Sequence, residues 1–329
     1  KNHAARVREY ISDPDIGYLK VERILDAAHS LRYQCARTVG ARRLDEDQLK
    51  KRIKERNVKP ESDYPLLDGY SKKYETEPDF KKIPLEPEED LLYFIRTYGR
   101  LEEWEKDIID IVREETLYFI PQIETKLINE GWASFWHYKL LNEMNLPQNL
   151  HFEFIKRHNQ VIKPYEKYLN PYYIGFHIFK NIYEKNNYCL DKIFEVREME
   201  RDQSFIRRYL TQDLCRELKL YEYEKDGSEY IVSEVSDEEG WIKIRDTLAA
   251  SAGTGNIPVI HITDWNQKEN SLLLEHIYDG RELELHYANE TLRYFVDLWD
   301  GRVILNTVID GKKRAIICNV DKKITIVNA

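Results

Sequence analysis

Residues 124–137 place an acid, a histidine and two tryptophans at helical spacing in one segment. At about 100° per residue, Glu130 and His137 return to within roughly 20° of the same helix face. Trp132 and Trp136, four residues apart, form a neighbouring aromatic stripe. A carboxylate and an imidazole are costly to bury without a partner, so this face favours proton transfer or metal binding. The alternative is a solvated glutamate beside a core histidine that is hydrogen-bonded to a backbone carbonyl.

The axial distance between Glu130 and His137 limits the chemistry that they can share. Seven residues at about 1.5 Å each separate the two side chains by roughly 10.5 Å, against about 6 Å for the histidines of a His-Glu-x-x-His helix. We therefore expect different roles, with Glu130 as a metal ligand and His137 as a group that binds substrate or transfers a proton. Ser134 lies between them and is small enough to leave room for a ligand.

Several motifs follow one another in a fixed order: Glu114–Glu124, Asn129–Ser134, Trp136–His137, Asn170–Gly175, Phe194–Glu198 and Asp202–Thr211. In this order they resemble the signature of the stage V sporulation protein R (SpoVR) family, strongly over about 88–218 and more loosely beyond. The resemblance implies a cytoplasmic protein of spore cortex formation, or of the stress response in prokaryotes that form no spores. It also implies two partners, a serine kinase of the AAA type and a protein with a von Willebrand A-like domain, for a non-catalytic regulator or scaffold.

Residues 129–133 (Asn-Glu-Gly-Trp-Ala) are also similar to a helix of several zinc peptidase families, in which a glutamate joins two upstream histidines as the third metal ligand. This analogy implies a metal-dependent hydrolase in which Glu130 binds Zn²⁺ or another divalent ion, with a zincin-like fold when complete. The SpoVR family has a His-x-x-x-His segment running into Asp-Phe-Phe-Lys, to which nothing here corresponds. We therefore expect a fragment that lacks the completing histidines and holds metal weakly by itself.

Further charged residues follow residues 124–137, which we call the first segment. The family resemblance implies that Glu195, Glu198 and Asp202, at spacings of three and four, look into the site from one helix face. Arg197 would then be a counter-ion, or a clamp for a carboxylate or phosphate. Glu124, at the start of the first segment, is another candidate catalytic residue. The alternative is a solvated helix face of weak i,i+4 pairs.

The composition limits the class of protein. The chain has 329 residues, 42% of them hydrophobic and 33% charged, enough for one large or two moderate soluble domains. The net charge of −9 is spread along the chain, which disfavours nucleic-acid binding. No apolar run approaches the ~20 residues of a membrane span. Four cysteines far apart, with no Cys-x-x-Cys pair, suit a reducing, cytoplasmic compartment and argue against a cysteine zinc site.

Periodicity predicts an α+β fold in four parts. Residues 1–57 are expected to be helical, and the five prolines of 58–87 predict an extended linker or strap. Residues 88–218 are expected to form a large mainly α-helical core, and residues 219–329 a small α+β domain. Pro121 is expected to break or kink the helix before the first segment. The last domain is expected to contain two hairpins, at 220–235 and 302–327, and helices at 238–251 and 285–299, with strands at 258–264 and 271–278 between them.

Gly253-Thr254-Gly255 could suggest a phosphate-binding loop. It lacks the following Lys-Ser/Thr, and it lies after a predicted helix and before a strand, which is the wrong order. A helix terminated by glycine is the better interpretation.

Overall fold

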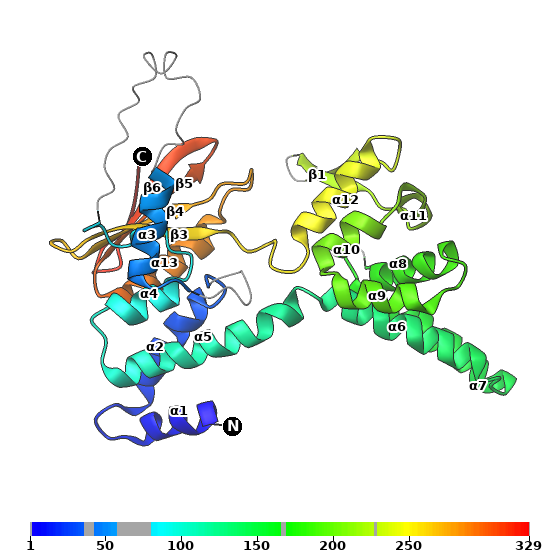
Figure 1. Cartoon of the computed structure of the whole chain (residues 1–329), viewed down its shortest axis with the longest axis horizontal. Helices are drawn as coiled ribbons and strands as arrows, with labels where there is room; N and C mark the ends of the chain where they lie inside the picture. The colour runs from blue at the N-terminus through cyan, green and yellow to red at the C-terminus, as the bar shows by residue number, and fades with distance from the viewer. Residues whose placement is uncertain (1, 36–42, 58–79, 166–168, 227–228, 329) are drawn as a thin grey trace, which may run out of the picture. The chain divides into compact units, whose positions relative to one another are not determined.

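A computed structural model describes residues 2–35, 43–57, 80–165, 169–226 and 229–328. It has a mainly helical N-terminal region and a mixed C-terminal sheet, which confirms the α+β class (Figure 1). Most of the expected strap, residues 58–79, lies outside the described residues. The described helices are α1 (Asn2–Ser12), α2 (Gly17–Leu31), α3 (Glu46–Asn57), α4 (Leu91–Tyr98), α5 (Glu103–Ile123), α6 (Lys126–Glu143), α7 (Gln148–Val161), α8 (Pro171–Lys185), α9 (Leu190–Met199), α10 (Asp202–Tyr209), α11 (Gln212–Glu217), α12 (Gly240–Ser251) and α13 (Leu285–Trp299).

The described strands form two sheets. A two-stranded sheet pairs β1 with β2, and a five-stranded sheet has the order β3-β4-β5-β6-β7. In the larger sheet β4 and β5 are parallel and every other neighbouring pair is antiparallel. The strands are β1 (Glu222–Asp226), β2 (Glu229–Glu234), β3 (Ile260–Asn266), β4 (Ser271–His276), β5 (Arg302–Ile309), β6 (Lys312–Cys318) and β7 (Ile324–Asn328).

The chain forms two compact units. Unit 1 contains residues 1–117 and 258–329, and unit 2 contains residues 118–257. The bounds expected from periodicity, 88–218 and 219–329, follow the change in secondary structure. The units follow packing instead: α12 lies after the first hairpin but contacts α10 and α11, which groups it with the helices before it.

In unit 1 the helix α13 links the parallel strands β4 and β5 and packs on β5, β6 and α2 (Figure 1). Parallel neighbours need such a crossover, because a tight turn can only reverse the chain. The side chains of Phe295 and Trp299 on α13 are buried, and so are Val303 and Leu305 of β5. Their alternation along β5 gives the sheet one apolar face, which forms the core with α13 and α2.

The end of the chain differs from the expected hairpin over 302–327. It has three strands, because β6 ends at Cys318 and the chain turns back to form β7. The turn is closed by a hydrogen bond from the Asn319 amide to the Lys323 carbonyl, and Lys322 takes a positive φ of 62°. The predicted hairpin was therefore one strand short.

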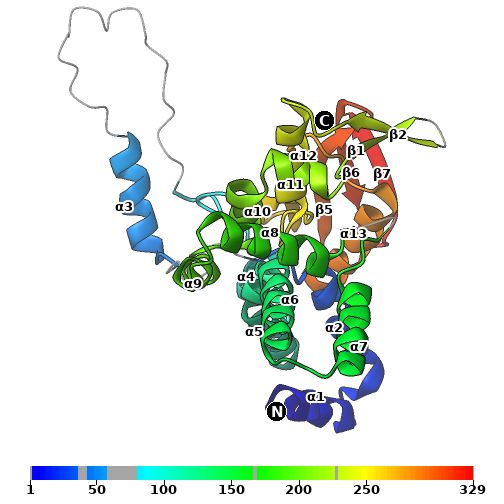
Figure 2. The same cartoon turned by 90° about the vertical axis from the view of Figure 1, so that its right-hand side faces the viewer.

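Unit 2 is built around the close contact between α6 and α8 (Figure 2). Gly131 of α6 and Gly175 of α8 face each other, and a Cβ added to Gly131 would lie 2.4 Å from the Gly175 carbonyl carbon. The two backbones can approach this closely only because both residues lack a side chain. Apolar residues of α9 to α12, such as Ile193, Phe205 and Leu214, complete the core of this unit.

The first turn of α6 is held by a residue of α10. The buried Asp202 carboxylate accepts hydrogen bonds from the backbone amides of Leu127 at 2.9 Å and Ile128 at 3.0 Å. These amides have no partner within their own helix, so Asp202 acts as the cap. Pro121 lies in the last turn of α5, which ends at Ile123, so the chain breaks before α6 as predicted. In the described residues no helix is long and apolar enough to cross a membrane.

Candidate functional site

The aromatic stripe expected on α6 is present. The ring centres of Trp132 and Trp136 are 5.6 Å apart, and the Phe194 ring of α9 lies 5.4 Å from Trp132 and 5.8 Å from Trp136. The Trp136 indole nitrogen is buried, and none of the described residues accepts a hydrogen bond from it. The stripe packs α6 against α9 and so sets which side chains of the two helices meet.

Next to this stripe, two adjacent polar residues of α6 each have a partner on another helix. The Tyr172 hydroxyl of α8 donates a hydrogen bond to the Glu130 carboxylate, and this bond raises the pKa of Tyr172. The Arg197 guanidinium of α9 donates to the side-chain oxygen of Asn129 at 2.7 Å. Glu130 is half-buried, and a carboxylate that accepts one hydrogen bond keeps lone pairs for another ligand. We call these four residues the α6 polar cluster.

Glu124 lies between α5 and α6, apart from the other candidate residues of the first segment, Glu130, Ser134 and His137. Its carboxylate pairs with the Arg201 guanidinium at 2.9 Å, and its backbone carbonyl accepts from the Asp202 amide at 2.8 Å. Asp202 itself is 2% exposed, and burial raises its pKa to about 6. Both oxygens of the Asp202 carboxylate already accept hydrogen bonds from the backbone of α6, so Asp202 has a structural role there.

The expectation that Glu195, Glu198 and Asp202 share one helix face is wrong. The helix α9 ends at Met199, the chain is extended at Glu200, and a new helix begins at Asp202. Glu195 and Glu198 are exposed, and Glu195 pairs with Lys192 of its own helix at 2.9 Å, as the solvated alternative predicts. Spacing along one continuous helix was assumed, and the break removes it.

His137 is exposed, and it lies beside the buried His158. Its ring centre is 5.9 Å from that of His158 on α7 and 5.5 Å from that of Phe154. His158 is 3% exposed, and its Nε2 has no hydrogen-bond partner among the described residues. Burial, followed by the nearby His137 and His177, lowers the pKa of His158 to about 4. The core histidine of this region is thus His158.

The described side chains around Glu130 offer few ligands for a metal ion. Within the described ranges, no group of three or more His, Cys, Asp or Glu side chains could hold an ion. Glu130 fits as a single ligand, because ligating carboxylates are themselves hydrogen-bonded by neighbours, as Tyr172 does here. Ser134, the small residue between Glu130 and His137, is 5% exposed and lies in the helix interface rather than beside an open space.

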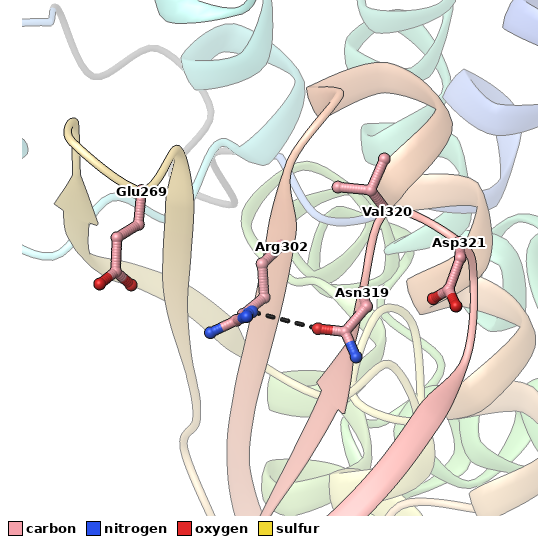
Figure 3. Close-up of a pocket in the computed structure, with 5 residues that line it drawn as sticks. All are labelled: Glu269, Arg302, Asn319, Val320 and Asp321. Atoms are coloured by element: carbon pink, nitrogen blue, oxygen red, sulfur yellow. Dashed lines mark hydrogen bonds between the residues drawn. The ribbon is translucent and has the colours of Figure 1, made fainter.

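A polar pocket of about 550 Å³ lies at one end of the strands of the larger sheet in unit 1, near the β3–β4 and β6–β7 turns. Arg302 of β5 and Asn319, just after β6, face each other across it and are joined by a hydrogen bond of 3.1 Å (Figure 3). Its other lining residues are Glu269, Val320 and Asp321. No residue that the sequence singled out lines this pocket.

Comparison with known proteins gives the family. A model described as "SpoVR like protein" matches residues 1–257, and one described as "SpoVR-like C-terminal domain" matches residues 258–310. The chain belongs to the SpoVR-like family. The second match begins at the residue where the chain returns from unit 2 to unit 1.

The chain is also similar to the "Uncharacterized protein YcgB" of Escherichia coli (strain K12), with 30% identity over 338 aligned residues. The alignment covers 91% of this chain and 66% of that protein, just under two thirds of its length. No solved structure matches this SpoVR-like chain.

Asn129 and Tyr172 of the α6 polar cluster, and His158 beside His137, were not among the site residues predicted from the sequence. Tyr172 follows the helix-capping pair Asn170-Pro171, in a motif that gave only the family resemblance. His158 lies outside every family motif quoted above. A tyrosine in the first turn of a helix has its hydroxyl near the helix end, where a partner from another helix can reach it. That signal could have drawn attention to Tyr172.

Proposed function

We propose that this SpoVR-like protein acts in the stress response or in sporulation, including spore cortex formation, as a metal-dependent hydrolase with Glu130 as a metal ligand. The observation that supports it most is the half-buried Glu130 carboxylate held by Tyr172 on one side of the α6 polar cluster. A carboxylate so oriented is arranged as metal-binding carboxylates usually are. Its neighbour Asn129 is oriented by Arg197 in the same way.

Under this proposal Glu130 would hold a divalent ion such as zinc through its carboxylate, which Tyr172 orients. Such an ion, when bound, would supply activation of a water molecule near neutral pH. Because the described residues offer Glu130 no ligand set of their own, the remaining ligands must lie outside the described ranges or on another chain. Arg197 and His137 are proposed to bind substrate or move protons, and Glu124 keeps Arg201 in place.

The test is the metal content of the full-length protein, measured by elemental analysis. Glu130→Gln should abolish metal binding, because an amide is a much poorer ligand for zinc than a carboxylate. Tyr172→Phe should weaken metal affinity by roughly 10- to 100-fold, the usual effect of losing an outer hydrogen bond to a ligand. His137→Ala should leave metal in place and remove activity, because the axial offset of roughly 10.5 Å is too long for a shared ion.

Two outcomes would contradict this assignment. Loss of metal in His137→Ala as complete as that in Glu130→Gln would show that the two residues do not have separate roles. Full metal content in Glu130→Gln would remove Glu130 from the site altogether.

A second candidate is a non-catalytic regulator or scaffold that acts with a serine kinase and a von Willebrand A-like partner. It is favoured by large apolar side chains that are exposed on both sides of the turn between α6 and α7, namely Leu140, Met144, Leu150 and Phe152. Exposed apolar side chains that gather in one region are typical of protein-binding surfaces. A full-length wild-type protein without stoichiometric metal would favour this candidate.

A further inference from the structure

Unit 2 contains a pocket that the α6 polar cluster does not use. It has a volume of about 400 Å³ and is lined by residues from Arg201 to Arg208 along α10, by Glu124, and by the loop 252–254 that follows α12. Three arginines line it, namely Arg201, Arg207 and Arg208, against the single carboxylate of Glu124. A concave surface with this excess of guanidinium groups favours an anionic ligand.

The loop is the one that contains Gly253-Thr254-Gly255. As predicted, it ends a helix, since α12 stops at Ser251 and Gly253 takes a positive φ of 61°. A Cβ at Gly253 would come within 3.2 Å of the Glu124 Cα, so glycine also lets the loop lie against the α5–α6 junction. Gln203 holds the loop to α10 by donating to the Ala252 carbonyl at 3.4 Å. The loop is therefore a wall of the arginine pocket even though it is no phosphate loop of the usual order.

The three arginines differ in how they are paired. Arg201 pairs with Glu124 at 2.9 Å, and Arg208 pairs at 2.8 Å with Glu200, whose side chain is only 3% exposed. Arg207 is exposed and has no hydrogen bond or ion pair with any described residue. Within the same part of the chain, the backbone amides of Gly253 and Thr254 likewise have no hydrogen-bond partner. The pocket is thus lined by one unpaired cation and by two residues whose backbone amides are unpaired.

We propose that this pocket binds a small phosphomonoester, with Arg207 as the principal contact to the phosphate. A guanidinium presents parallel N–H donors that match a phosphate, and backbone amides of a glycine loop add further donors. The volume is at the lower end of the range for small-molecule sites, which suits a small metabolite. None of the described lining residues is aromatic, so the pocket offers no surface for stacking a nucleotide base.

The test is calorimetric titration of the full chain at 150 mM NaCl with three probes, inorganic phosphate, ribose 5-phosphate and uncharged ribose. We expect saturable binding of the two phosphate probes at one site per chain and no binding of ribose. Arg207→Ala should weaken phosphate binding at least tenfold, and Arg207→Lys should recover part of it, because lysine restores the charge without the fork of donors. Arg207 is exposed and has no polar partner in the part of the chain that the structure describes, so Arg207→Ala should leave the protein folded, whereas Arg208→Ala would leave the buried Glu200 unpaired.

The matched control is Arg157→Ala on α7, an exposed arginine outside the pocket. It should leave phosphate affinity unchanged. The proposal is overturned if neither phosphate probe binds saturably, if Arg207→Ala binds like the wild type, or if Arg157→Ala weakens binding as much as Arg207→Ala. The last result would mean that phosphate responds only to the overall surface charge.

Discussion

At the scale of single residues, Asp202 shows how one buried carboxylate connects segments that are far apart in the chain. It caps the first turn of α6, 74 and 75 positions earlier in the sequence. Burial raises its pKa to about 6, although the amides of Leu127 and Ile128 oppose this rise. The competition between desolvation and hydrogen bonding makes the stability of this unit depend on pH.

The substitution Asp202→Asn tests this dependence. A carboxyl whose folded pKa lies above its unfolded pKa near 3.8 stabilises the protein most below pH 3.8, and that stability is lost as pH rises through about 6. The free energy of unfolding of the wild type, measured in urea relative to Asp202→Asn, should therefore fall between pH 4 and pH 7, by up to about 3 kcal/mol. The exposed residue Asp191 provides the control, Asp191→Asn. A difference that stays constant over this pH range would show that the Asp202 carboxyl is not destabilised by burial.

At the scale of elements, the α6–α8 contact positions the Glu130 carboxylate against Tyr172. Gly131 and Gly175 allow the two helix backbones to touch, and this brings Glu130, next to Gly131, to Tyr172 in the first turn of α8. The closeness of the backbones leaves no room for even one methyl group. The polar cluster therefore depends on two glycines that have no chemistry of their own.

The substitution Gly131→Ala should destabilise the protein by roughly 1 to 3 kcal/mol, because the added methyl group overlaps the α8 backbone. This sign is the reverse of the gain of about 1 kcal/mol that alanine gives over glycine within an unhindered helix. Urea unfolding of both variants and of the exposed-site control Ala133→Gly would measure it, the control losing only about 1 kcal/mol. If Gly131→Ala were as stable as the wild type, the two helices could not be in backbone contact.

At the scale of the whole molecule, unit 2 is one continuous segment, whereas unit 1 is formed from two segments that are far apart in sequence. Each unit has its own hydrophobic core. In unit 1 the core joins Ile24 and Leu31 of α2 to Phe295 and Trp299 of α13. Within 258–329 the helix α13 covers the apolar face of the sheet, but α13 is itself buried against α2, so this core is complete only when the N-terminal segment is present.

This arrangement predicts different behaviour for two excised segments. Residues 118–257 should fold alone into a helical domain with a cooperative thermal transition, because their core lies within the segment. Residues 258–329 should not, because α2 is missing. Far-UV circular dichroism and thermal unfolding of both peptides would test this. Cooperative folding of 258–329 alone would show that α2 is not needed for its core.

The sequence by itself determined the features that depend on neighbouring residues. Helical periodicity predicted the helical stretch that contains α6 and α8, Pro121 placed the break before α6, and the order of the motifs gave the SpoVR-like family. The side-chain oxygen of Asn170 accepts from the Tyr172 amide at 3.1 Å, a helix cap that the Asn-Pro pair already indicates. These features follow from backbone geometry over a few residues, so a local pattern is sufficient to predict them.

Only the tertiary structure decided which side chains meet. The bonds from Tyr172 to Glu130 and from Arg197 to Asn129 join residues about 40 to 70 positions apart, and the three pocket arginines face a loop more than 40 positions later. The break at Glu200, which periodicity also did not record, separated Glu195 from Asp202. Contacts at such separations depend on how closely whole helices pack. Steric fit at positions such as Gly131 and Gly175 controls this packing, and the periodicity of the sequence contains no information about it.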